Sequence, residues 1–247
     1  MSASAMAVPE IELATPDLNP WPLTIATYNI HGAVGTDGKF APLRIAEVLL
    51  EMGVDMVALQ EVPLGGGGIP DVLECLSEVT GFNAVEGYTY SVSGRRYGNG
   101  ILSRYPILSS RSIDLSVGNH EPRCALDADV NCHGHPLRVV ATHLGLNVAE
   151  RRNQIERLLQ VFDTDQMAMI LLGDINEWFV WGRSLRRLVG HFQPVPAFAT
   201  FPSRWPIFSL DRIWIKPRHR LMQVQVHATP TARVASDHLP LIAHIDG

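Results

Sequence analysis

The sequence predicts an α/β protein that forms one large domain. Its 247 residues suffice for a sizeable core, because single α/β domains often exceed two hundred residues. Hydrophobic residues make up 46% of the chain and charged residues 18%, which is a globular composition. Short apolar runs rich in β-branched residues alternate with segments of helical periodicity, and no fixed-period repeat interrupts that order.

The N-terminal segment, residues 1–20, is expected to be a mobile acidic tail ahead of a single catalytic domain over residues 21–247. The tail contains three acids and no base, and it lacks the basic flank and apolar stretch of a secretion signal. Subtracting those three negative charges from the net charge of −5 leaves −2 on the domain. No overall positive field therefore attracts nucleic acid, and any anion binding must be local.

The cysteine content favours a reducing compartment. Cys75, Cys124 and Cys132 are odd in number and have no paired spacing, which argues against a disulfide framework. His133 and His135 beside Cys132 lack zinc-site spacing and indicate a polar hairpin turn. No apolar run reaches the roughly 18 residues of a membrane span. We expect a cytoplasmic monomer with no transmembrane segment.

Strands are expected at seven apolar runs. Each run is short, contains β-branched residues and is bounded by turn-forming residues. They cover residues 23–28, 54–59, 126–130, 137–141, 167–172, 210–215 and 239–245.

Two amphipathic helices are expected, one over residues 41–52 and a second starting at Asn147. Pro42 near the start of the first helix and Gly53 just past its end are typical of helix boundaries. Asn147 can cap the second helix, and Glu150 three residues later completes a capping-box pattern. The second helix is expected to present a basic, solvated outer face.

Polar side chains gather where the predicted strands end. Each alone has an ordinary explanation, because Asp and Asn often form turns and a lone His is usually structural. Together, hard oxygen ligands and imidazoles repeated at strand ends describe a metal-assisted hydrolytic site. The residues are Asn29, His31, Glu61, His143, Asp174, Asn176, Asp211, Asp237 and His238.

Seven short motifs carry a family resemblance. YNIHG, LQEV, GNGILSR, THL, GDIN, LDRI and SDHLP occur in that order over residues 23–245. In this the chain resembles the endonuclease/exonuclease/phosphatase superfamily, which includes deoxyribonuclease I. The resemblance implies a four-layer α/β/β/α sandwich, in which two mostly antiparallel sheets pack face to face with helices outside. It also implies a divalent-metal-dependent enzyme that hydrolyses a phosphodiester with activated water.

The resemblance further implies a role for each site residue. Glu61 is the principal ligand of Mg²⁺ or Mn²⁺, assisted by Asn29 and Asp237, and the metal neutralises charge on phosphate oxygens. His238 is the base that activates water, and Asp211 fixes its tautomer through a hydrogen bond.

The remaining motif residues are expected to act on the phosphate. Asp174 and Asn176 hold the nucleophile, the phosphate or a second metal, and the resemblance leaves that choice open. His143 contacts phosphate or protonates the leaving oxygen, and Asn99 supports the same phosphate. His31 stands where the apurinic endonuclease branch has an aspartate, which favours a single metal.

Arg123 has two interpretations. A guanidinium there can form a bidentate clamp on phosphate. A surface salt bridge with Glu121 is the alternative.

Substrate choice is expected to depend on a long loop over residues 177–210. Exposed aromatic side chains among arginines suit unpaired bases, as in a nuclease, or a lipid interface, as in a phospholipid or phosphoinositide phosphoesterase. Trp178 and Phe201 are expected in the core instead. A catalytically inactive binding protein is disfavoured, because the metal glutamate and the base are both present. The loop contains Trp178, Phe179, Trp181, Phe198, Phe201, Trp205 and Phe208, with Arg183, Arg186, Arg187 and Arg204 among them.

Overall fold

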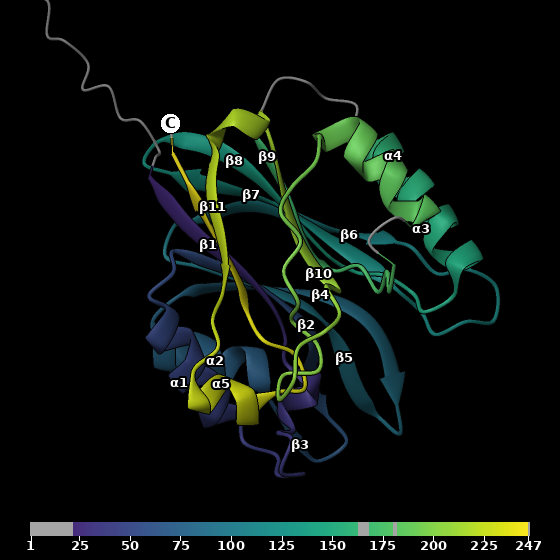
Figure 1. Cartoon of the computed structure of the whole chain (residues 1–247). Coiled ribbons are helices and arrows are strands. Elements are labelled where there is room, and N and C mark those ends of the chain that lie inside the picture. Colours follow the sequence, from purple (N-terminus) through teal and green to yellow (C-terminus); the bar gives the residue numbers. More distant parts are fainter. Residues whose placement is uncertain (1–21, 163–167, 180–181, 247) are drawn as a thin grey trace, which may run out of the picture.

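Two β-sheets pack face to face and carry helices on their outer faces in the computed structural model (Figure 1). The model describes residues 22–162, 168–179 and 182–246. The expected tail, residues 1–20, lies outside that range. The four layers confirm the α/β/β/α sandwich that the family resemblance predicts.

The first sheet has seven strands in the described part of the chain, in the order β11-β12-β1-β2-β5-β4, with β3 paired to β2. The β1–β2 pair is parallel and its other pairs are antiparallel. The strands are β1 (Leu23–Asn29), β2 (Met56–Gly66), β3 (Ile69–Asp71), β4 (Asn83–Val92), β5 (Arg95–Ser103), β11 (Leu221–Val226) and β12 (Leu241–Ile245).

The second sheet has five strands among the described residues, in the order β10-β9-β8-β7-β6. Here β8 and β9 are parallel, and the other pairs are antiparallel. The strands are β6 (Ile107–Asp114), β7 (Cys124–Cys132), β8 (His135–His143), β9 (Met169–Asp174) and β10 (Asp211–Lys216). The turn between β7 and β8 contains His133, which confirms the prediction of a polar hairpin turn at this position.

Side-chain alternation along the strands builds the layers. In β1, Leu23 and Ile25 face the core between the sheets, whereas Ala26 and Tyr28 face the outer helices. The first sheet is covered by α1 (Pro42–Met52), α2 (Val72–Thr80) and α5 (Pro230–Ala235), and the second by α3 (Val148–Val161) and α4 (Arg183–Phe192). Two short 3-10 turns, η1 (His31–Ala33) and η2 (Arg218–Arg220), complete the elements.

Both predicted helices form, with the predicted ends. Pro42 is the first residue of α1, and Gly53 ends it with a left-handed φ of 61°. Asn147 and Glu150 make the capping box of α3. The prediction of a solvated basic face on α3 is wrong at Arg151, whose exposed fraction is 1%. None of the helices in the described ranges has the length and apolar character of a membrane span.

Residues 177–210 are not one long loop, because α4 interrupts them. Leu185, Leu188 and Phe192 recur at helical spacing and are buried against the second sheet. Trp178 is 38% exposed and packs edge-on against Phe201, so the expectation of a core position for Trp178 is wrong. Trp181 and the side chain of Arg183 lie outside the described part of the chain.

Candidate active site

Glu61 lies at a β-bulge in β2. The pairing of β2 with β5 shifts between Leu59 and Val62, so two residues of β2, one of them Glu61, lie opposite Asn99. Glu61 has a φ of 56°, a left-handed value that is uncommon outside glycine. The Nδ2 atom of Asn29, the last residue of β1, donates to Oε1 of Glu61 at 2.9 Å.

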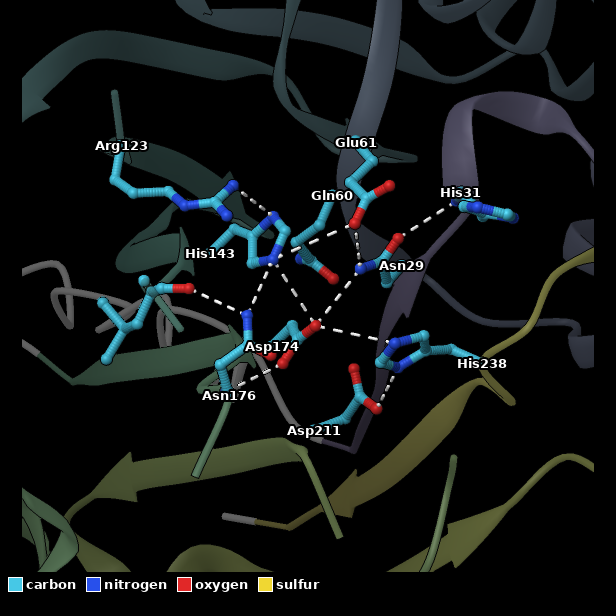
Figure 2. Close-up of polar contacts among 12 residues, drawn as sticks. Asn29, His31, Gln60, Glu61, Arg123, His143, Asp174, Asn176, Asp211 and His238 are labelled. Carbon is cyan, nitrogen blue, oxygen red and sulfur yellow. Dashed lines mark hydrogen bonds and ion pairs between the residues drawn. The ribbon is translucent and has the colours of Figure 1, made fainter. Parts of the chain in front are cut away.

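Three of the predicted residues, His143, Asp174 and Asp211, lie side by side at one end of the second sheet (Figure 2). The strand register pairs Asp174 with His143 on one side and with Asp211 on the other. Asn29 also donates to Oδ2 of Asp174 at 3.2 Å. One amide therefore links Glu61 of the first sheet to Asp174 of the second, and the site lies where the two sheets meet.

Asp211 and His238 form the predicted hydrogen-bonded pair. Nδ1 of His238 lies 2.9 Å from Oδ2 of Asp211, and Nε2 lies 3.7 Å from Oδ2 of Asp174. Two residues that the sequence did not single out hold the pair. The hydroxyl of Thr200 donates to Asp211 at 2.5 Å, and the hydroxyl of Ser236 donates to the carbonyl of Asn29 at 2.7 Å and accepts from the backbone NH of His238.

The charge of this cluster favours a protonated His238. Burial lowers the pKa of the imidazole, but the negative charges of Asp211, Asp174 and Asp237 outweigh burial and raise that pKa above its usual range. Burial also raises the pKa of Asp174, and the charge of Asp211 adds to the rise, while His238 opposes it. Asp174 and His238 therefore lie close enough for the charge of each to shift the pKa of the other.

His143 is neutral and oriented. Burial, helped by the positive charge of Arg123 and of His238, holds the pKa of His143 well below its usual range. Nδ1 of His143 lies 3.2 Å from Nη1 of the Arg123 guanidinium, which can only donate. Nε2 lies 3.0 Å from the amide nitrogen of Asn176 and 3.5 Å from Oδ2 of Asp174.

Arg123 also makes the salt bridge with Glu121 that was the alternative interpretation, at 3.0 Å. The same guanidinium therefore contacts both the acid outside the site and the imidazole inside it. Asn99 is buried and its amide donates to the carbonyl of Cys124 at 2.9 Å, which places it beside the pocket that Arg123 and Glu61 line.

Asp237 lies at the rim rather than in the centre. Its carboxylate is 3.8 Å from Nδ1 of His31 and accepts from the hydroxyl of Ser236 at 3.4 Å. His31 is itself exposed and contacts the carbonyl of Val34. Asp237 and His31 therefore lie close together, and both are more exposed than the buried Asp211–His238 pair.

The comparisons with known proteins agree with this arrangement. The model of the Endonuclease/Exonuclease/phosphatase family matches residues 26–238. The chain belongs to this family. The uncharacterized protein YbhP of Escherichia coli is 28% identical over 90% of this chain and 95% of its own length.

Solved structures show the same fold. An endonuclease/exonuclease/phosphatase from Beutenbergia cavernae matches with a TM-score of 0.77 and 22% identity, over 91% of this chain and 71% of its own. The mannosyl-6-phosphatase Bt3783 of Bacteroides thetaiotaomicron matches with a TM-score of 0.66 and 18% identity, over 90% of this chain and 98% of its own. At these identities the likeness concerns the fold alone.

The endonuclease/exonuclease/phosphatase family consists typically of phosphoester hydrolases that generally depend on divalent metals, and the residues present here fit such a metal. Glu61 and Asp174 bring carboxylate oxygens to the same amide group of Asn29, and oxygen ligands suit hard cations. Asp174, Asp211 and His238 also place potential ligand atoms within 4.8 Å of one another. Oδ1 of Asp211 has no hydrogen-bond partner among the described residues. Because Asp211 holds Nδ1 of His238, the oxygens of Glu61 and Asp174 are the better candidates.

A buried ion pair supports two loops next to the candidate active site. Nη1 of Arg151 donates to the carbonyls of Gly145 and Leu146, which follow His143, and Nη2 lies 3.4 Å from the carboxylate of Glu177, which follows Asn176. Arg151 thus joins the loop after β8 to the loop after β9.

Replacing Arg151 with methionine is expected to lower the free energy of unfolding by about 3–5 kcal/mol, because Glu177 is left buried without its charged partner. Urea denaturation measures this change. The double variant Arg151→Met/Glu177→Gln should recover part of the loss. If the double variant loses as much free energy of unfolding as the two single variants, Arg151→Met and Glu177→Gln, lose in sum, the two side chains are not coupled.

Proposed function

We propose that the chain hydrolyses a phosphodiester, using a divalent cation and a water molecule activated by His238. The observation that carries the proposal is the Asp211–His238 hydrogen bond of 2.9 Å, next to Asp174 and the Asn29–Glu61 pair. An imidazole held by a carboxylate and a group of acidic oxygens are the parts that metal-assisted hydrolysis requires.

In this proposal His238 accepts the proton of the attacking water. Asp211 holds Nδ1, so Nε2 is the atom that faces the site. Only the neutral imidazole can accept a proton, whereas the surrounding carboxylates favour the cation. Positive charge bound at Glu61 and Asp174 favours the neutral form by offsetting those carboxylates.

The other predicted residues bind and orient the phosphate. Glu61, together with Asp174, would hold Mg²⁺ or Mn²⁺, which would neutralise charge on the phosphate oxygens. With the ring proton on Nε2, His143 can donate to a phosphate oxygen or to the leaving oxygen, while Arg123 contacts the other ring nitrogen.

Asp174 lies between the two imidazoles, and Asn176 contacts His143. Asp174 is within 3.5 Å of His143 and 3.7 Å of His238, and its Oδ1 accepts from the backbone NH of Asn176. We place these two residues next to the water and the phosphate, where Asp174 can orient the nucleophile.

Two surfaces next to the site support an extended anionic substrate. Tyr90 and Tyr97 stack with ring centroids 5.7 Å apart and line the pocket with Arg123, an arrangement that suits a base or another flat group. Trp205 and Ile207 are 81% and 70% exposed beside Arg204, which favours the second candidate, a phospholipid or phosphoinositide phosphoesterase.

A substrate panel tests the proposal. The purified chain with Mg²⁺ or Mn²⁺ is offered plasmid DNA, an abasic duplex, RNA, a phosphoinositide, phosphatidylglycerol and a chromogenic diester, with a chelator as the control. We expect metal-dependent hydrolysis of the chromogenic diester and of one natural class. Full activity in excess chelator, or no hydrolysis of any ester, contradicts the proposed function.

Replacing Arg204 with glutamine is expected to raise KM for the extended substrate roughly 3- to 10-fold, equivalent to about 1 kcal/mol of lost charge contact. The small chromogenic diester should be hydrolysed as before. Arg187→Gln is the matched control, because Arg187 pairs with Glu156 on the outer helices, away from the loop of Arg204. Equal loss with both esters, in a folded Arg204→Gln protein, would make the loop structural.

A further inference from the structure

A cavity of about 680 Å³ lies between α4 and β10, on the outer face of the second sheet. Ligand pockets for small molecules typically measure about 300–1,000 Å³ and have mostly apolar walls. The helix contributes one face, with residues at spacings of three and four, and the strand contributes the floor. The principal lining residues are Leu185, Val189 and Gly190 of α4, Val195 beyond it, and Arg212 and Trp214 of β10.

The sheet separates this cavity from the catalytic group. Successive residues of a strand point to opposite faces, so Arg212 and Trp214 point away from the face on which Asp211 lies. Trp214 belongs to the apolar cluster under α3 and α4, whereas Ile213 belongs to the core between the sheets. A ligand in the cavity would therefore not contact the proposed phosphate site.

Two positive charges accompany the apolar walls. Arg212 is only 3% exposed, and Nη1 donates to the backbone carbonyls of Ser209 and Asp211. Among the residues that the structure describes, no carboxylate lies within 4.0 Å of the Arg212 guanidinium, although Asp211 and Glu177 act on it from farther away. Buried charges are normally paired. Arg186, on the lining face of α4, is exposed and adds a second cation.

Gly190 is an exposed residue of α4 that lines the cavity. It lies in the last turn of α4 and does not have the left-handed φ that requires glycine. Glycine within a helix costs up to about 1 kcal/mol relative to alanine. A Cβ atom built at Gly190 meets no atom within 4 Å, so packing does not require glycine either. A larger side chain at this position would enter the space that a ligand needs.

We propose that this cavity binds a single-chain anionic amphiphile. Its hydrocarbon chain lies between Val189 and Trp214, and its anionic head lies at Arg186 and Arg212. The apolar walls suit the hydrocarbon chain of the ligand. The Arg212 guanidinium, which has no carboxylate within 4.0 Å among the described residues, suits its anionic head. The site is independent of the proposed hydrolysis, because it lies on the other face of the sheet.

Isothermal titration of the full chain with decanoate tests this inference. We expect saturable binding, with decanol at least about tenfold weaker because charge-assisted hydrogen bonds to the head are lost. Acetate, which has the head without the chain, should not bind. Arg186→Gln should weaken decanoate binding and leave decanol unchanged.

Gly190→Phe should abolish decanoate binding, whereas Gly190→Ala should keep it and raise the melting temperature of the protein. Circular dichroism shows whether each variant is folded, and Arg186→Gln provides a second test if Gly190→Phe is not. Equal decanoate affinity in the wild type and a folded Gly190→Phe protein would overturn the proposal. So would binding that appears only after removal of residues 1–20, because the cavity would then belong to the chain's own N-terminal segment.

Discussion

Replacing His238 with alanine is expected to lower kcat at least about 100-fold, the usual contribution of a general base. His238 is the imidazole whose Nε2 faces the carboxylates of the site, while Asp211 holds its other nitrogen. Steady-state kinetics on the chromogenic diester with saturating Mg²⁺ measures the loss. Unchanged turnover in a folded His238→Ala protein would move the base elsewhere, and Asp174 is the nearest candidate.

The pH profile separates a base from a structural residue. The charges of Asp211 and Asp174 raise the pKa of His238, and the base must lose its proton to act, so the rate should increase with pH as His238 deprotonates. Asp211→Asn should move this limb to lower pH, because one of the charges that raises the pKa is removed. If the rate of the Asp211→Asn protein rises over the same pH range as that of the wild type, the group that deprotonates is not His238.

Replacing Glu61 with glutamine is expected to reduce activity at least about 100-fold at a Mg²⁺ concentration that half-saturates the wild type, because a metal ion supplies several kcal/mol of charge stabilisation. The glutamine oxygen can still accept from Asn29, so the change removes charge with little change of shape. Activity as a function of Mg²⁺ concentration measures the shift in metal affinity.

Glu86→Gln is the matched control for Glu61→Gln. Glu86 is an exposed carboxylate on β4 that pairs with Arg96, and it lies outside the candidate site. Its replacement should leave the metal dependence unchanged. A Glu61→Gln protein with the Mg²⁺ dependence of the wild type would remove Glu61 from the proposed metal ligands.

The residues of the candidate active site could be predicted from the sequence because they lie at the ends of short buried strands. Asn29, His143 and Asp174 each end an apolar run, and the register of such runs brings their ends to one edge. Thr200 could not be predicted in this way. It lies in an irregular segment with no periodicity, and backbone hydrogen bonds with Phe208 and Leu239 hold it beside Asp211.

Two of the strands that escaped prediction, β4 and β6, have little apolar surface. β4 and β6 lie at sheet edges, and most of their side chains are exposed, so neither shows the apolar alternation of an internal strand. Gly65 and Gly66 end β2, and Gly67 and Gly68 form the turn to β3. There a Cβ atom at Gly66 would come within 2.4 Å of the carbonyl oxygen of Gly94, so only glycine fits.

The burial of Arg151 could not be predicted from its own helix either. Alternating charge along α3 is typical of a solvated face, and the partner, Glu177, is 26 residues away in the sequence. The pairing depends on how the loops after β8 and β9 approach the helix. Tertiary contacts of this kind leave no local signal in the sequence.

The order of the strands in the first sheet has a consequence for biosynthesis. β12, the last strand described, lies between β1 and β11, and His238 lies three residues before its first residue, Leu241. A ribosome-bound chain therefore carries Asn29, Glu61 and Asp174 long before it carries His238, the proposed base. The proposed site is complete only when β12 pairs with β1, so partly synthesised chains lack it.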